Sequence, residues 1–300
     1  MEQPRLDLVV NDMVQCTEAS VSNLDNLSAS SLPANNLPAE NLSAKDLSVK
    51  DLSVNDLSAI DAVAACNPRQ FVQQLDLDLL NQRFAQASPQ EILNWCITHI
   101  PKGLVQTTSF SFLAISHMLY EELNHPVPVI FLDTLHLFPE TLDTARQAQA
   151  HYHLDLHTYT AIGAHSQASF AARYGEKLWD TDIDRFYELT KVEPLQRALG
   201  DLGAIAWITG RRRDQSEARK DLPIFERDDQ GRLKINPLAR WTHKDLWAYV
   251  FKHDVMYNPL HDQGYTSIGD QPLTTRTVAG EDERAGRWRG SDKTECGIHL

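Results

Sequence analysis

Short apolar segments alternate with helix-forming segments from about residue 100 onward, and this alternation constrains the fold of the 300-residue chain most. Strands are expected at 103–109, 126–134, 154–159 and 204–209, and helices at 110–124 and from about 139. Apolar periodicity also predicts helices at 76–84 and 89–99. Such alternation predicts an α/β fold with a parallel sheet covered by helices on both faces. In these sheets, ligands bind at the carboxyl ends of the strands.

Polar clusters stand where three of the four expected strands end. These clusters are Thr107-Thr108-Ser109, Asp133-Thr134 and Gly210-Arg211-Arg212. The carboxyl ends of parallel strands meet at one edge of a sheet, so we expect the three clusters to lie together. The hydroxyl cluster either caps the following helix or cradles a phosphate, because a helix N-terminus presents free N–H groups.

The arginine-rich segment at 210–216 is a second candidate for anion binding. It holds Arg211, Arg212, Arg213, Gln215 and Ser216, and Arg219 and Lys220 follow it. Guanidinium groups match the oxygens of phosphate or sulfate in a two-point geometry. Lys191 and Glu193, in the sequence Lys-Val-Glu-Pro, are expected to join this site.

The charge of the chain bears on the class of ligand. The formal net charge is −13, and residues 1–62 hold ten acidic against three basic residues, a net of −7, which leaves about −6 for the rest. An acidic body disfavours non-specific binding of nucleic acid. Two basic clusters in this body favour a small polyanion instead, although solvated surface arginines remain an alternative. The clusters are Arg211–Arg213 with Arg219 and Lys220, and Arg284, Arg287 and Arg289 with Lys293.

The first sixty residues carry a five-residue repeat, in which a leucine recurs from Leu27 to Leu57. This spacing resembles the pentapeptide-repeat solenoids, but charged and polar residues occupy the positions where that family has small inward side chains. Seven repeats would also form fewer than two solenoid turns without caps. We interpret residues 1–62 as a largely disordered acidic tail and 63–300 as a globular domain.

Cysteine usage indicates the cellular compartment. Cys16, Cys66, Cys96 and Cys296 are widely separated, with no Cys-x-x-Cys pair. This spacing argues against a disulfide framework and against a zinc or iron–sulfur site built from cysteines alone. The start of the chain lacks the pattern of a secretory signal, and no apolar run approaches the length of a spanning helix. We therefore expect a cytoplasmic protein that does not enter the membrane.

Cys296 lies in the polar segment Glu295-Cys296-Gly297-Ile298-His299 near the end of the chain. Cationic neighbours favour the reactive thiolate form of a cysteine. Lys293 and His299 flank Cys296 at three residues on either side, whereas Glu295 opposes them. A reactive thiol and an incidental terminal cysteine both remain open from spacing alone.

Taken together, these segments resemble the phosphoadenylyl-sulfate (PAPS) reductase family from about Leu104 to the last residue. The resemblance rests on the blocks Thr-Thr-Ser-Phe (107–110), Asp-Thr-Leu-His-Leu-Phe-Pro-Glu-Thr (133–141), Lys-Val-Glu-Pro-Leu (191–195), Thr-Gly-Arg-Arg-Arg-Asp-Gln-Ser (209–216), Ile-Asn-Pro-Leu (235–238), Gly-Tyr-Thr-Ser-Ile-Gly-Asp (264–270), Gly-Glu-Asp-Glu-Arg-Ala-Gly-Arg-Trp (280–288) and Lys-Thr-Glu-Cys-Gly-Ile-His (293–299).

The resemblance implies an adenine-nucleotide α-hydrolase-like fold and a complete reaction. The thiolate of Cys296 would attack the sulfur of PAPS, and reduced thioredoxin or glutaredoxin would release sulfite from the resulting S-sulfocysteine. Cys296 and His299 would be the catalytic residues, and a homodimer is one assembly that the family implies. The expected substrate-binding residues are Thr107, Thr108, Ser109, Phe110, Asp133, Thr134, Lys191, Glu193, Gly210, Arg211, Arg212, Arg213, Gln215, Ser216, Arg219 and Arg287.

Missing cysteines bear on the substrate. Relatives that use adenylyl sulfate (APS) usually hold an iron–sulfur cluster with two cysteine pairs, and here Leu189, Thr190, Asp270 and Leu273 stand at those positions. We therefore expect PAPS as substrate and no cluster. Ser111 replaces a glycine common in the family, which would weaken nucleotide binding if positive φ or close backbone approach is required there. A cluster-free APS reductase and a non-catalytic nucleotide-binding regulator remain the alternatives.

Overall fold

The structure is a computed structural model that describes residues 68–278, 280–290, 293 and 295–298. The five-residue repeats and His299 lie outside the described residues, so the boundary at residues 62 and 63 stays a prediction. The chain divides into two units, Met1–Phe71 and Val72–Leu300. Every site considered below lies within the second unit.

A six-stranded sheet forms the centre of the second unit, in the order β3-β2-β1-β4-β6-β5. All neighbouring strands are parallel except β5 and β6, and residue Gln106 of β1 is in register with Val129 of β2 and Ile208 of β4. The four expected strands are confirmed, with shorter bounds, whereas β5 and β6 were not predicted. The strands are β1 Leu104–Thr108, β2 Val129–Leu132, β3 Leu156–Tyr159, β4 Ala206–Ile208, β5 Phe225–Arg227 and β6 Leu233–Ile235.

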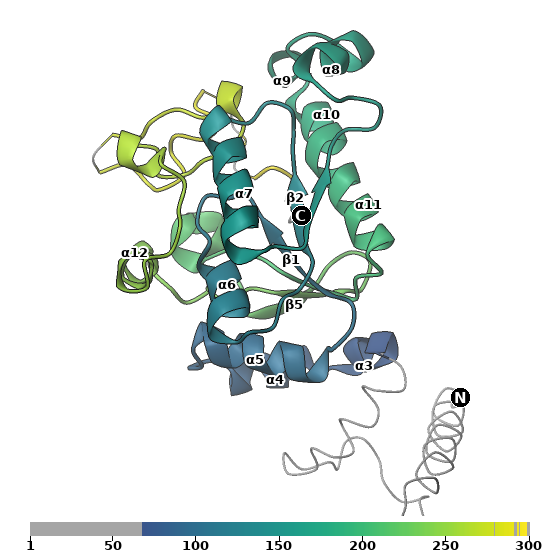
Figure 1. Cartoon of the computed structure of the whole chain (residues 1–300), viewed down its shortest axis with the longest axis vertical. Helices are drawn as coiled ribbons and strands as arrows, with labels where there is room; N and C mark the ends of the chain where they lie inside the picture. The colour runs from purple at the N-terminus through teal and green to yellow at the C-terminus, as the bar shows by residue number, and fades with distance from the viewer. Residues whose placement is uncertain (1–67, 279, 291–292, 294, 299–300) are drawn as a thin grey trace, which may run out of the picture. The chain divides into compact units, whose positions relative to one another are not determined.

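Helices cover both faces of the sheet, which confirms the expected fold class. Successive side chains of a strand point to opposite faces, and Val105, Ile130 and Trp207 pack against α11 (Glu193–Asp201) on one of them. On the other face, Gln106 Nε2 donates a hydrogen bond of 2.9 Å to Ser116 Oγ of α6 (Ala114–His117). Figure 1 shows α6 and α7 (Pro139–Tyr152) on one side of β1 and β2, with α11 on the other.

Local sequence signals explain where several helices begin. Ser88 and Glu91 form a reciprocal capping box at the start of α5 (Pro89–His99), and Pro139 occupies the first turn of α7. The helices expected at 76–84 and 89–99 are confirmed as α4 (Leu77–Arg83) and α5. The remaining helices are α3 Pro68–Gln74, α8 Gln167–Tyr174, α9 Leu178–Thr181, α10 Ile183–Tyr187, α12 His243–Lys252, the π-helical η2 Met118–Glu122 and η3 Glu188–Val192, and the 3₁₀ turns η4 Arg213–Gln215, η5 Glu217–Arg219, η6 His261–Gln263 and η7 Gln271–Leu273.

The helix expected at 110–124 begins later than predicted. Phe110 has a φ of 52°, and its backbone N–H donates to Thr108 Oγ1 at 3.1 Å, so a turn connects β1 to α6. A threonine hydroxyl that bonds nearby backbone competes with helix formation, which accounts for the delay. The α6 N-cap is Leu113, without a side-chain hydrogen bond. The 107–109 hydroxyls therefore do not cap this helix, and that alternative is wrong.

None of the helices within the described residues is both long enough and apolar enough to cross a bilayer.

Candidate active site

A cavity of about 240 Å³ opens at the carboxyl ends of β1, β2 and β4. Since these three strands are neighbours in the sheet, the polar clusters that follow them meet there, as the sequence predicts. The cavity is lined by Thr107 and Thr108 at the end of β1 with Ser109 just after it, by Thr134 after β2, and by Gly210, Arg211 and Arg212 after β4. Gln215, Arg219, Lys191, Arg287 and Cys296 complete the set of predicted residues in its wall.

Positive charge dominates the cavity wall. Among the described residues that line it, six carry a cation and one, Glu283, carries a carboxylate. Burial and the like charge of Arg219 lower the pKa of Arg211 to about 10, and burial does the same for Arg284. Carboxylates packed against the wall, among them Asp270, Glu226 and Glu295, pair with several of these cations, and the donors that remain suit an anion in the cavity. The six are Lys191, Arg211, Arg212, Arg219, Arg284 and Arg287.

Glu295 anchors the segment that carries Cys296. Its two carboxylate oxygens accept hydrogen bonds from Arg219 Nε at 2.6 Å and Nη2 at 2.7 Å, and Arg284 Nη2 lies 3.2 Å from Oε2. Burial alone would raise the pKa of Glu295, but the Arg219 hydrogen bond and the Arg284 and Arg219 charges lower it overall. Glu295, which was expected to oppose the thiolate, thus pairs with two arginines and holds the segment that carries Cys296 close to Arg219 and Arg284.

Cys296 is half-buried in the cavity wall. It packs beside the aromatic cluster that contains Tyr187 and Trp288, while Ile298 packs against the α11 cluster. Lys191 and Arg284, two cations of the cavity wall, lie close enough to interact electrostatically with Cys296.

The surroundings of Cys296 differ from those of Cys96 and from the sequence-based expectation. Cys96 is fully buried on α5, and burial raises the pKa of its thiol far above the usual range. Lys293, which was expected to flank the reactive thiol, pairs with Asp184 and lies 5.5 Å from the centre of the Tyr187 ring. The cations beside Cys296 therefore come from elsewhere in the fold.

Lys191 forms a buried ion pair that the sequence did not reveal. Its ammonium lies 2.7 Å from Asp270 Oδ2, and the Asp270 side chain is 0% exposed. Burial would lower the pKa of Lys191, but the charge of Asp270 raises it overall. The pair joins η3 to the loop before η7, 79 positions apart in the chain. It thereby fixes a cation in the cavity wall.

Arg287 lies tightly against the loop at 266–269. An added Cβ at Gly269 would come within 2.1 Å of the Arg287 Cζ atom, so a side chain at position 269 would displace the guanidinium. Arg287 Nη1 donates to Ile268 O at 3.3 Å, and the guanidinium lies 4.6 Å from the centre of the Trp288 ring. Within the part of the chain that the structure describes, its buried Nε has no hydrogen-bond partner. This leaves a donor that an anion can satisfy.

Comparison with known proteins identifies the family. A family model described as the phosphoadenosine phosphosulfate reductase domain matches residues 104–276. The chain belongs to this family. The phosphoadenosine phosphosulfate reductase of Emericella nidulans is 46% identical over 230 residues, which cover 74% of this chain and 74% of the relative. The enzyme of the same name from Saccharomyces cerevisiae is 43% identical and covers 76% of this chain and 91% of its own length.

The family also includes relatives named for the other nucleotide. The adenosine 5′-phosphosulfate reductase of Salinibacter ruber is 43% identical over 74% of this chain and 88% of its own length. A crystal structure of PAPS reductase from Candida auris, a phosphate complex, superposes with a TM-score of 0.62 and 42% identity over 67% of this chain and 97% of that one. The resemblance drawn from the sequence blocks and the expected adenine-nucleotide α-hydrolase-like fold are both confirmed.

Among the residues that the structure describes, five of those predicted for the PAPS reductase site do not line the cavity, and the side chains of four of them have other contacts. The Phe110 ring is buried against Phe131, and Asp133 accepts the Leu135 N–H at 2.8 Å, with burial raising the Asp133 pKa. Glu193 pairs with Arg197 one helical turn away, and Arg213 Nε donates to Leu222 O. The five are Phe110, Asp133, Glu193, Arg213 and Ser216. Direct substrate contact by these residues stays a prediction.

The sequence-based list of site residues omitted Arg284, Glu283 and the loop at 266–269. All of them line the cavity. Their signal was present, since Arg284 belongs to the second basic cluster and the loop belongs to the Gly-Tyr-Thr-Ser-Ile-Gly-Asp block. The sequence could not show that the loop at 266–269 lies beside the end of β1, because the two segments are far apart in the chain.

Ser111, where the family commonly has glycine, does not require a glycine-like backbone. The positive φ of this turn falls on Phe110, and Ser111 is not among the residues with positive φ. Its hydroxyl lies 2.9 Å from His261 Nε2, and its carbonyl accepts the Asn258 N–H at 3.0 Å. Burial lowers the pKa of His261 to about 4, so the neutral ring donates from Nδ1 to Tyr265 O and accepts the serine proton at Nε2. The serine is integrated into the wall of the cavity.

Proposed function

We propose that this chain reduces PAPS to sulfite and adenosine 3′,5′-bisphosphate with Cys296 as the nucleophile. The observation that carries the proposal is a half-buried cysteine in the wall of a cavity lined by six cations at the carboxyl ends of a parallel sheet. The substrate is a nucleotide with several anionic groups, which this charge suits. Relatives named PAPS reductase support the assignment.

In the first step, the Cys296 thiolate attacks the sulfur atom of the sulfate group. A bond forms between Sγ and that sulfur, the S–O bond to the phosphate breaks, and adenosine 3′,5′-bisphosphate leaves with the electron pair. The cations of the cavity wall stabilise the negative charge that develops on the leaving oxygen. The product on the enzyme is S-sulfocysteine at position 296.

In the second step, a thiolate of reduced thioredoxin or glutaredoxin attacks Cys296 Sγ, and sulfite leaves with the electron pair of the S–S bond. The second thiol of the partner then attacks the mixed disulfide, which returns the Cys296 thiolate and leaves the partner oxidised. Cys96, the other cysteine among the described residues, is fully buried on α5, so the proposal assigns the resolving thiols to an external dithiol. The proposal includes a cytoplasmic location, where such dithiols are kept reduced, and a homodimer as the assembly to test.

We further propose that the reaction uses no iron–sulfur cluster. The four positions at which cluster-containing relatives carry cysteines lie together, since Leu189 and Leu273 pack in one apolar cluster and Asp270 pairs with Lys191 next to Thr190. These side chains offer no thiolate, and a cluster bound by four cysteines does not fit them.

A paired assay with PAPS and APS tests the proposed function. With reduced thioredoxin as the reductant, we expect kcat/KM to be at least roughly tenfold higher for PAPS, because only PAPS offers a 3′-phosphate to the arginines. Sulfite is measured in both reactions. A preference for APS would assign the chain to the activity for which the Salinibacter ruber relative is named. Nucleotide binding by folded protein without sulfite from either substrate would indicate a regulatory binding protein.

Replacing Arg287 with alanine should lower kcat/KM for PAPS by about 100-fold, because a charge-assisted donor to the nucleotide is lost. Arg289→Ala is the matched control, since Arg289 lies two positions away, is 43% exposed and pairs with Glu281. The control should stay within about twofold of wild type. Steady-state kinetics and circular dichroism on both variants provide the measurement. Equal kcat/KM values in the two variants would show that Arg287 does not bind the substrate.

A further inference from the structure

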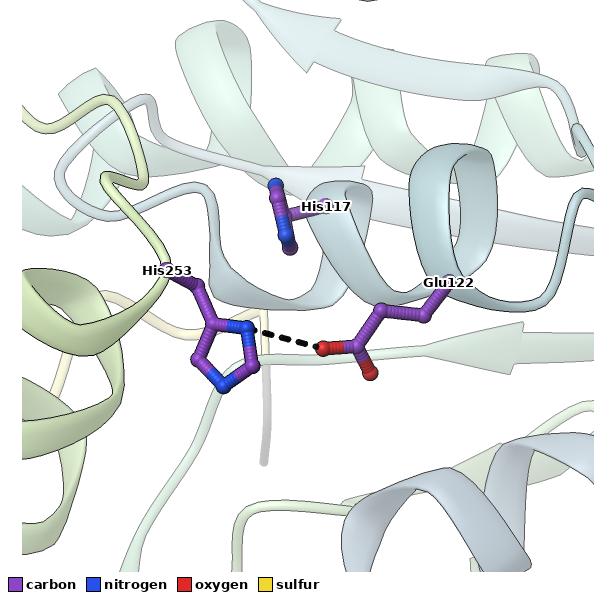
Figure 2. Close-up of side chains that lie close together, drawn as sticks. All are labelled: His117, Glu122 and His253. Atoms are coloured by element: carbon purple, nitrogen blue, oxygen red, sulfur yellow. Dashed lines mark ion pairs between the residues drawn. The ribbon is translucent and has the colours of Figure 1, made fainter.

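Three side chains that could bind a metal ion gather on the α6 side of the sheet. His117 is the last residue of α6, Glu122 is the last residue of η2, and His253 follows the C-terminal end of α12. One ligand atom from each lies within 4.8 Å of the other two. Figure 2 shows the His253 ring directed at the Glu122 carboxylate, with His117 beside them. None of the three lines the active-site cavity.

The π-helical turn η2 brings His117 and Glu122 together. In a regular α-helix, residues five apart are separated by roughly 140° around the axis, so their side chains leave from different faces. In η2 the hydrogen bonds span five residues, for example from Leu123 N to Met118 O at 2.8 Å. This wider turn places residues five apart one above the other. Such π-helical insertions occur frequently at functional sites.

The surroundings hold the carboxylate in position. Tyr249 Oη donates to Glu122 Oε1 at 2.8 Å, and Gln90 Nε2 donates to Glu122 Oε2 at 2.9 Å. The His253 ring stacks on the Tyr249 ring with centroids 4.4 Å apart. Hydrogen bonds and packing of this kind orient the ligands of metal sites.

We propose that His117, Glu122 and His253 form a binding site for a divalent transition-metal ion, with zinc as the best match. Two imidazoles and one carboxylate are ligands that zinc accepts, whereas magnesium and calcium prefer oxygen ligands alone. A tetrahedral zinc ion holds its ligand atoms roughly 3.4 Å apart. His253 Nδ1 and Glu122 Oε1 are already 3.5 Å apart, and the His117 ligand atom lies within 4.8 Å of both, so binding would require it to move closer.

The exposure of two of the three side chains also suits a metal site. The side chains of Glu122 and His253 are 24% and 30% exposed, which leaves a path for the ion and room for a water as fourth ligand.

The bound ion would join the end of α12 to the end of α6 and η2. Both helices also contribute to the active-site cavity, α6 through Ala114 and Ile115 and α12 through Leu246. Zinc at this place therefore acts as a structural clip between two walls of the cavity. Its binding should stabilise the protein without any role in the chemistry at Cys296.

Zinc titration of the full-length chain tests the proposal. The protein is prepared without a histidine tag, carries Cys296→Ser so that the reactive thiol does not bind the metal, and is stripped with a chelator. We expect the parent to bind one zinc ion per chain at this site. Changing Glu122→Gln or His253→Asn should lower the affinity of the site for zinc at least about tenfold. Zinc at 100 times the parent's Kd should raise Tm by about 5 °C in the parent and by no more than about half as much in either variant.

Two matched controls make the result specific. Glu121→Gln changes the neighbouring exposed acid, and His165→Asn changes an exposed histidine outside the cluster. Both should bind zinc as the parent does, and cobalt in the parent should give the visible absorption of a tetrahedral ion. The proposal is wrong if Glu122→Gln and Glu121→Gln bind zinc with equal affinity. It is also wrong if neither Glu122→Gln nor His253→Asn binds less zinc than the parent, and in both cases the cluster is a packing contact.

Discussion

Replacing Cys296 with serine should reduce sulfite release from PAPS at least about 1,000-fold. A thiolate is a far better nucleophile toward sulfur than a serine hydroxyl, which stays protonated at neutral pH. Nucleotide affinity should change by no more than about threefold, because the substitution removes no charge from the cationic wall. Sulfite release and equilibrium binding of adenosine 3′,5′-bisphosphate are the two measurements.

Cys96→Ala is the matched control for this prediction. Cys96 is buried on α5 and does not line the cavity. Its replacement should lower the stability of the protein but leave kcat unchanged. Wild-type protein incubated with PAPS and no reductant should also gain the mass of one sulfonate group on Cys296. Sulfite production that persists in Cys296→Ser, or a sulfonate on another residue, would show that the nucleophile is assigned wrongly.

Replacing Asp270 with asparagine should lower the free energy of unfolding by about 3–5 kcal/mol, because it leaves the Lys191 ammonium buried without its counter-charge. Both side chains of the pair are almost inaccessible, at 11% and 0% exposure. Urea denaturation at pH 7 measures the loss. Glu193→Gln provides the control, since the Glu193–Arg197 pair is about one-third exposed on both sides and should contribute no more than about 0.5 kcal/mol.

The effect of Asp270→Asn should depend on pH in a defined window. Burial would raise the pKa of Asp270, but the charges of Lys191 and Arg287 lower it below 3.8, so its contribution is present above that pH and is lost as the pH falls through the lowered value. The pKa of Lys191 is raised above 10.5, so its contribution is present below that pH and is lost on going higher. The stability difference between wild type and variant should therefore hold from about pH 5 up to the pH at which the unpaired Lys191 of the variant loses its proton, and it should shrink above that pH because burial lowers the pKa of an unpaired Lys191. No difference at about pH 5 would contradict the buried pair.

The sequence predicted four of the six strands, β1 to β4, and the end of the sheet at which the site lies. It succeeded there because β1, β2 and β4 are apolar runs that end in recognisable polar clusters. It missed β5 and β6, which are three residues each and contain Glu226 and Lys234. Lys234 is buried over the Trp207 ring, where burial lowers its pKa to about 7, so a lysine occupies a strand position that periodicity alone assigns to solvent.

The sequence predicted the positive charge of the candidate site but not the ion pairs that its side chains form. Arginine runs and a terminal cysteine are visible in a sequence, whereas their pairing depends on loops that return from far along the chain. Asp270 illustrates this limit, since the sequence identified it only as a position without cysteine, and the fold makes it the counter-charge of Lys191. Glu295 is the second case, because proximity in sequence made it an opponent of the thiolate and the fold pairs it with Arg219.

The Arg219–Glu295 contact ties the position of the nucleophile to the charge state of the cavity. Arg219 and Arg284 line the cavity and also hold Glu295. In the proposed reaction, each would divide its hydrogen bonds between Glu295 and an incoming nucleotide. Nucleotide binding and docking of the tail would then be coupled: the factor by which a bound nucleotide changes the equilibrium of tail docking equals the factor by which the docked tail changes nucleotide affinity. Release of the bisphosphate would return both arginines to Glu295 and restore the position of the proposed nucleophile.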